Sequence, residues 1–197
     1  MAARSAFIAK RSSRSRAAPR RRGTCLRSPL LSDVGPCRLL HFRALTAEDQ
    51  DKLWHWLHIA LWDPPPAGPR PVEVLQTAGV RIYAEGWGRA TDVGVVAQVD
   101  GQDAGACWLR LLPVGVGLAS VDAETPQLGI ALDQAFQRQG HGRLLMREAL
   151  RAAWLAGYRQ VSLTVHPENP ARFMYERCGF RKVGVRSTFH LMLASAG

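Results

Sequence analysis

The sequence has little of what marks a membrane, secreted or metal-binding protein. Its 197 residues contain no run approaching the ~18 consecutive apolar residues that a membrane helix requires. Its four cysteines have no C-x-x-C spacing, so they predict neither a disulfide framework nor a zinc site. We therefore expect a cytoplasmic protein in a reducing compartment, with no membrane partner and no metal.

Acidic residues are scarce in the N-terminal segment: Asp33 is the one acid before residue 38. Residues 1–38 hold ten Lys or Arg, so this segment carries +9 of the formal net charge of +10. Such a composition cannot bury enough apolar surface to fold. The sequence therefore predicts a basic, disordered extension over 1–37 and one folded, nearly neutral domain over 38–197.

Three interpretations of the extension stay open. We favour a non-functional segment, such as a mis-set translation start, because length and charge alone rarely establish function. Its Arg- and Ser-rich composition is also typical of an organelle-targeting segment. The third interpretation is a basic arm that touches the phosphates of a nucleic acid, which is the only nucleic-acid contact that we expect.

Helix and strand patterns alternate through the rest of the chain, which predicts an α/β protein with a mixed sheet covered on both faces. Residues 113–126 are expected to form a loop or a weak strand. The Asp100-Gly101 pair predicts a hairpin turn between two of the strands. The expected elements are a strand at 40–45, a helix from Thr46 to about 62, a helix at 71–83, strands at 93–99, 104–111 and 127–133, a helix at 140–156, a strand at 161–165, a helix at 169–178, and two strands within 180–193.

A short glycine motif lies between the expected strand at 127–133 and the long helix that follows. The motif is Gln137-Arg138-Gln139-Gly140-His141-Gly142. Its glycines allow a tight turn, and the helix start offers free N–H groups and the positive end of the helix dipole. These features predict an anion site for phosphate. Neither the dinucleotide pattern G-x-G-x-x-G nor the P-loop ending G-K-[ST] is present.

Two motifs in this order give the chain its resemblance to a known family. Residues 137–142 match the pattern [RQ]-x-x-G-x-[GA], which follows the fourth strand in that family. The strand Val161–Val165 is followed by Asn169, then by Tyr175 and by Gly179-Phe180. From about Arg38 to Leu193 the chain resembles the GNAT superfamily of N-acetyltransferases. The resemblance implies one domain with six or seven mostly antiparallel strands, a splayed parallel pair and about four helices.

The resemblance also implies the cosubstrate, acetyl-CoA, and the residues that hold it. The pyrophosphate would sit on backbone N–H groups of the glycine loop, and the pantetheine arm would pair with the fourth strand. Asn169 would bind the pantetheine near its thiol, although it would also cap a helix. We interpret His141 as a loop residue that faces solvent, with phosphate contact as its alternative role. The expected cofactor-binding residues are Ile130, Ala131, Leu132, Gln137, Arg138, Gln139, Gly140, His141, Gly142, Arg143 and Asn169.

The same resemblance implies direct attack of a neutral amine on the thioester. A backbone N–H of the fourth strand would stabilise the oxyanion. Tyr175 would protonate the leaving thiolate, unless it is only a core aromatic. Many family members place a Glu general base where this chain has Gln127, which cannot accept a proton. Glu124, Asp122 or a water chain could replace it, and Glu124 is our candidate catalytic residue beside Tyr175.

The acceptor is left open among small amines, antibiotics, peptide N-termini and protein lysines. The resemblance places its pocket near Trp54, Leu57, Trp62, Tyr83, Trp87 and 185–193, with Asp63, Glu73 and Glu85 as candidate acids. An alternative function is a catalytically silent acyl-CoA-binding regulator, because the expected glutamate is missing at Gln127. Homodimers are common among the proteins that the chain resembles, but no residue establishes one here.

Overall fold

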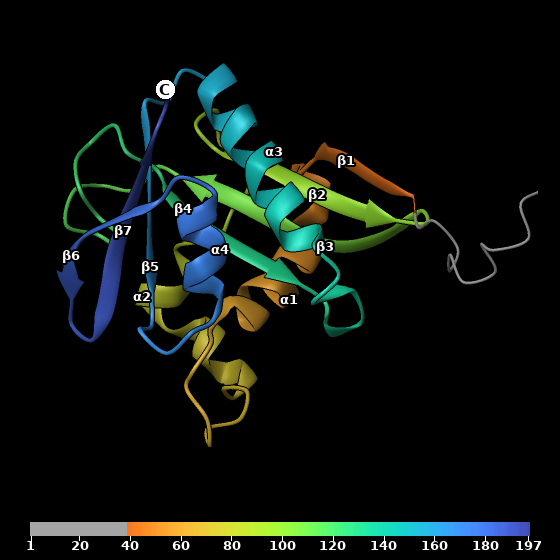
Figure 1. The fold of residues 1–197 in the computed structure, drawn as a ribbon, viewed down its shortest axis with the longest axis horizontal. Coiled ribbons are helices and arrows are strands. Elements are labelled where there is room, and N and C mark those ends of the chain that lie inside the picture. The colour runs from red at the N-terminus through yellow and green to blue at the C-terminus, as the bar shows by residue number, and fades with distance from the viewer. Residues whose placement is uncertain (1–38) are drawn as a thin grey trace, which may run out of the picture. The chain divides into compact units, whose positions relative to one another are not determined.

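The computed structural model of the protein describes residues 39–197, which form a seven-stranded sheet with helices on both faces (Figure 1). The predicted extension and its boundary at residue 38 lie outside the described residues. The strand order is β1-β2-β3-β4-β5-β7-β6. The strands are β1 (Leu40–Ala44), β2 (Val93–Val99), β3 (Gln102–Arg110), β4 (Gln127–Leu132), β5 (Gln160–Val165), β6 (Arg181–Arg186) and β7 (Phe189–Ser195).

The first four strands form an antiparallel half-sheet, as expected from the hairpin signal. β2 and β3 join through Asp100 and Gly101, whose φ angles of 51° and 82° are both in the left-handed region. Asp and Gly tolerate that region better than other residues, so the dipeptide specifies the turn locally. β4 then pairs antiparallel with β3 along its whole length, from Gly105 opposite Leu132 to Arg110 opposite Gln127.

The parallel pair of the sheet is β4 and β5, and it is splayed. Its register contains one pair of residues, Gln127 opposite Ser162, near the start of both strands. Beyond that point the two strands separate, while β5 continues to pair antiparallel with β7. The predicted mixed sheet with a splayed parallel pair is thus confirmed. The separation leaves backbone groups of β4 and β5 available to another molecule.

Two buried clusters cover the two faces of the sheet. Helix α3 (His141–Leu155) packs Leu145, Met146 and Ala149 against one face, where α4 (Ala171–Arg177) also lies. On the other face, Trp56 of α1 (Gln50–Ala60) packs with Trp108 of β3. The apolar residues of α3 recur at helical spacing, which gives the helix one buried side. No helix within 39–197 is long and apolar enough to cross a membrane.

The predicted helix at 71–83 is wrong in its extent. The structure has a 3-10 helix at Val72–Gln76 and a single α turn, α2, at Ala78–Arg81. Thr77 separates them with an extended backbone (φ −69°, ψ 135°). β-Branched residues and Gly79 weaken a continuous helix here. Two other 3-10 turns, Ala47–Asp49 and Gln134–Phe136, precede α1 and follow β4.

Candidate active site

The strand separation opens into a cavity of about 230 Å³ that reaches from one face of the sheet to the other. Tyr175 of α4 lines the cavity on the α3 side of the sheet. Gly129 and Ile130 of β4 line its middle, and Trp62 and Tyr83 line it on the α1 side. Two molecules can therefore meet at β4 while approaching from opposite faces.

Tyr175 is positioned by the packing of α4 against the sheet. Its ring lies 6.1 Å from that of Phe180, centroid to centroid, in an edge-on arrangement. Burial raises the pKa of its phenol well above the ordinary value, and the nearby Cys107 thiol adds to the effect. The hydroxyl therefore stays protonated at neutral pH. A protonated hydroxyl in a cavity wall can serve as a general acid.

Gln127 is buried and fully engaged in hydrogen bonds. Its Oε1 accepts hydrogen bonds from the Tyr83 hydroxyl (2.9 Å) and from the N–H of Ala119 (3.2 Å). Its Nε2 donates to the carbonyl oxygen of Val116 (2.6 Å). Gln127 thus holds the 113–120 loop and Tyr83 in place. The side chain is structural here, which agrees with the expectation that it cannot take a proton.

Glu124 and Tyr175 line different cavities. Glu124 is exposed and borders a second cavity of about 630 Å³, together with Asp122, Tyr158 and Arg159. Asp122 is engaged locally, since its Oδ1 accepts hydrogen bonds from the N–H groups of Glu124 and Thr125. The structure therefore does not bring these acids to Tyr175. The role of Glu124 as a base stays a prediction without geometric support.

The glycine loop stands exposed at the start of α3. Gly140 has φ 86°, a left-handed conformation that glycine adopts without strain, and it precedes the first helical residue. Gln137 ties the loop back to β4 through a 2.8 Å hydrogen bond from Nε2 to the Leu132 carbonyl oxygen. Arg138 and Arg143 are both exposed. The N–H of Gln137 is already donated to the Gln134 carbonyl oxygen (3.3 Å), so the N–H groups that an anion could use begin at Arg138.

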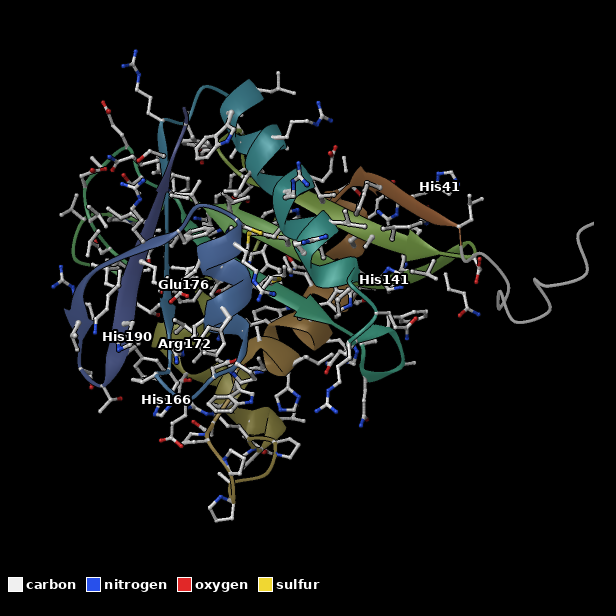
Figure 2. The ribbon with its side chains drawn as sticks, viewed as in Figure 1. His41, His141, His166, Arg172, Glu176 and His190 are labelled. Atoms are coloured by element: carbon white, nitrogen blue, oxygen red, sulfur yellow. The ribbon has the colours of Figure 1, made fainter. Side chains whose placement is uncertain are left out.

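The solvent-facing interpretation of His141 is wrong. His141 is the first residue of α3 and is 9% exposed, and its Nε2 is buried without a hydrogen-bond partner in the described part of the chain. Figure 2 shows its side chain at the start of the helix, well away from the group formed by His166, Arg172 and His190 near α4. The glycines on both sides let the backbone turn the imidazole inward.

Asn169 caps the short helix α4. Its Oδ1 accepts a 2.9 Å hydrogen bond from the N–H of Ala171, and its own carbonyl oxygen accepts one from the N–H of Arg172. The capping role that we anticipated is therefore present. It orients the start of the helix that carries Tyr175. Contact of Asn169 with a pantetheine arm stays a prediction.

Several cavity residues were missed by sequence reasoning. Trp108 and Gly129 face each other across β3 and β4, and a Cβ on Gly129 would lie 2.5 Å from Trp108 Cζ2. The glycine inside a strand pattern was a usable signal for such close approach. Arg70 also lines the cavity. It follows three consecutive prolines in a segment without periodicity, so no signal in the sequence marks it.

Two of the acids expected in the acceptor pocket, Asp63 and Glu85, are each paired with an arginine. Asp63 accepts hydrogen bonds from Nε (2.6 Å) and Nη2 (2.5 Å) of Arg70. The Arg70 guanidinium lowers the pKa of this carboxyl, so the pair remains ionised. Glu85 pairs with Arg81 one helical turn away. Within 39–197, no group of three His, Cys, Asp or Glu is placed to hold a metal ion.

The sequence matches the model of the acetyltransferase (GNAT) family over residues 53–180. No curated protein matches the chain. The fold is similar to the GNAT domain of S. lividans PAT, with 16% identity and a TM-score of 0.58 over 80% of this chain and 90% of that one.

Two further solved structures are similar to this chain. The PaiA N-acetyltransferase of Thermoplasma acidophilum, in complex with coenzyme A, has 16% identity and a TM-score of 0.57 over 80% of this chain and 99% of its own. The aminoglycoside acetyltransferase AAC(6')-Ib, in complex with coenzyme A, has 19% identity and a TM-score of 0.54 over 80% and 95%. At these identities the likeness establishes the fold.

Proposed function

Because the chain belongs to the acetyltransferase (GNAT) family, we propose that it moves an acetyl group from acetyl-CoA to a primary amine by direct attack. The observation that carries the proposal is the cavity at the β4–β5 separation, which Tyr175 lines together with Gly129 and Ile130 of β4. A thioester held there would have an acid on one side and an open approach for an amine on the other.

The donor side of the site is formed by the glycine loop and by β4. We propose that N–H groups within 138–143 hold the pyrophosphate, because they lie at the N-terminus of the 15-residue helix α3, whereas the N–H of Gln137 is taken by the Gln134 carbonyl oxygen. The pantetheine would then run along Ile130–Leu132 and pair with backbone groups that β5 leaves free. Asn169, at the start of α4, would contact the arm near its sulfur. The bound acetyl-CoA supplies an activated acyl group.

The chemical step then needs two groups of this chain. The amine attacks the carbonyl carbon, and a backbone N–H of β4 stabilises the developing oxyanion. The C–S bond breaks, and the Tyr175 hydroxyl gives its proton to the departing sulfur. Among the described residues that line this cavity, none is a carboxylate. The proton lost by the amine therefore leaves through water, and catalysis depends mainly on positioning.

Calorimetric titration of acetyl-CoA into the full chain tests the donor site. A Gly142→Glu variant places a carboxylate at the helix start; the Cβ fits, since its nearest neighbour, Leu132 Cδ1, would lie 3.4 Å away. We expect micromolar binding by the native chain and at least a tenfold loss in the variant, because the added charge repels phosphate. Equal binding by both proteins would overturn the assignment of the loop.

Turnover is tested separately by release of free CoA thiol in the presence of primary amines. Release that depends on the amine supports the transferase, whereas tight acetyl-CoA binding with no release for any amine supports a silent acyl-CoA binder. The small-molecule class is a reasonable starting point for the acceptor, because one similar structure is an aminoglycoside acetyltransferase.

A further inference from the structure

The acceptor end of the cavity combines aromatic walls with a single charged residue. The walls on the α1 side include Leu57, Leu61, Trp62, Tyr83 and Phe189, and every described residue lining the cavity other than Arg70 is uncharged. Such walls favour an apolar ligand body, because a polar or charged group buried there would lose its hydrogen bonds to water and gain few from the walls.

Three aromatic rings form a row, and the two outer ones, Trp62 and Phe189, line the cavity. The ring of His166 lies 5.7 Å from that of Trp62 and 5.8 Å from that of Phe189, centroid to centroid. The Nδ1 atom of His166 accepts a hydrogen bond from the N–H of Glu168 (3.2 Å), which fixes the ring in place. The wall formed by Trp62 and Phe189 is thus fixed in position, and an aromatic ligand would be stabilised by stacking against it.

Arg70 brings positive charge to the same end. Its partner Asp63 adjoins Trp62, and both carboxylate oxygens of Asp63 are occupied by the Arg70 guanidinium. Asp63 is not among the residues that line the cavity, whereas Arg70 is. A ligand in the cavity thus meets the cation of the pair and no free carboxylate. A second ammonium group there would lose hydration and find no free carboxylate, because the Asp63 charge is already paired with Arg70.

We propose that the acceptor is a primary monoamine with an aromatic, apolar body, and that Arg70 and the acid-free walls exclude amines with a second cation. This inference rests on the proposed transferase function. The attacking amine must give up its proton before it reacts, and this cost is the same for a monoamine and a diamine. A second ammonium stays charged and would lie toward Trp62 and Arg70. Polycationic acceptors such as aminoglycosides are therefore outside the predicted class.

A matched pair of amines tests the proposal directly. Benzylamine and 4-(aminomethyl)benzylamine share one ring and one reactive group, and differ by a second aminomethyl group. Binding of each to the full chain is measured by quenching of tryptophan fluorescence, with calorimetry as a second readout. We expect benzylamine to bind at least about tenfold more tightly, because the diamine must place its second ammonium beside Arg70.

Gly79 provides a variant that weakens the preference for the monoamine. It lines the cavity, and a Cβ there would meet nothing within 4 Å. Gly79→Asp adds a carboxylate to the wall and should narrow the preference for benzylamine at least about threefold through attraction of the second ammonium. Gly79→Asn has nearly the same size without the charge and should keep the native ratio.

The outcomes separate this proposal from the proposed function. Equal or tighter binding of the diamine by the native chain overturns the monoamine class, and so does failure of both amines to bind. An unchanged ratio in Gly79→Asp removes the electrostatic explanation. If the amines bind as expected but acetyl-CoA does not bind, the assignment of the amine pocket is supported and the proposed transferase function is refuted. If acetyl-CoA binds and neither amine does, the donor site stands and this inference falls.

Discussion

The Tyr83 hydroxyl donates a 2.9 Å hydrogen bond to Oε1 of Gln127, joining the segment just after α2 to the start of β4. The same oxygen accepts from Ala119, and Gln127 Nε2 donates to Val116. Gln127 occupies the position where the sequence resemblance leads one to look for a catalytic base. Its hydrogen bonds show that the position instead holds the loop that borders the acceptor cavity.

Restoring a glutamate at this position should therefore not restore a base. Gln127→Glu removes the donor to the Val116 carbonyl and sets a carboxylate oxygen against it, which should lower the free energy of unfolding by about 1–3 kcal/mol. We expect no gain in CoA release at neutral pH. Urea unfolding and the thiol-release assay measure both effects. Gln76→Glu, at an exposed position, is the control and should change stability by less than about 0.5 kcal/mol. Higher activity in Gln127→Glu would contradict the structural role.

Tyr175→Phe tests the proposed general acid. The variant keeps the ring against Phe180 and removes only the hydroxyl, so folding and acetyl-CoA binding should be preserved. We expect kcat to fall by about 10²–10⁴-fold, the usual contribution of a positioned acid. Steady-state kinetics with a constant amine measure the change. A fall in KM alone, with kcat unchanged, would show that Tyr175 does not protonate the thiolate.

The pH dependence gives a second readout for Tyr175. A phenol is the proton donor only below its pKa, and burial raises the pKa of Tyr175 above the ordinary value of 10.0. The acid form therefore persists to higher pH than in a free phenol, so no alkaline loss of kcat from this group is expected below pH 10. A rate that falls between pH 8 and 9 in the native chain, but not in Tyr175→Phe, would contradict the raised pKa.

Gly129→Ala should disturb the cavity through Trp108. The new Cβ would lie 2.5 Å from Trp108 Cζ2, and the indole is fully buried and cannot simply move aside. We expect a loss of about 1–3 kcal/mol in the free energy of unfolding and weaker binding of aromatic amines. Gly79→Ala is the matched control, because its Cβ meets no atom within 4 Å. Equal stability of the two variants would contradict the close packing at β4.

An ion-pair cluster at β1 and β3 predicts how stability changes in acid. Burial raises the pKa of Asp103, but hydrogen bonds from Arg43, Lys52 and Gln98 outweigh it, so the pKa falls below the usual range. A depressed folded-state pKa contributes stability above the unfolded value of about 3.9, which is lost as pH decreases. Asp103→Asn should cost about 2 kcal/mol at pH 7.

The difference between Asp103→Asn and the native chain should shrink from about pH 5 downward, as the Asp103 carboxylate of the unfolded chain becomes protonated while that of the folded chain stays ionised. Urea unfolding at several pH values measures it. Asp51→Asn, on the exposed side of α1, is the control and should show no such trend. A gap between native chain and Asp103→Asn that stays constant down to pH 3 would contradict the lowered pKa of Asp103.

Local signals in the sequence were sufficient to predict most of the strands and the turn of the glycine loop. Asp100-Gly101 specifies the hairpin because only a few residues tolerate two successive left-handed conformations. Gly140 ends the chain reversal before α3 for the same reason. The prediction of one helix over 71–83 was wrong in its extent because Thr77 takes an extended conformation. Tertiary packing there overrides the weak helix propensity of the segment.

The sequence by itself determined the order of most strands and helices along the chain and the glycine turn before α3, because each depends on backbone preferences within a few residues. The splayed pair was expected from the family resemblance, since it joins Gln127 to Ser162 across the sheet. Only the tertiary structure decided that Glu124 and Tyr175 line different cavities, and that Arg70 lines the cavity of Tyr175 while Asp63 does not. These relationships join residues more than fifty positions apart, such as Arg70 and Gly129. Their side chains meet through the packing of both sheet faces, and no local periodicity encodes that meeting.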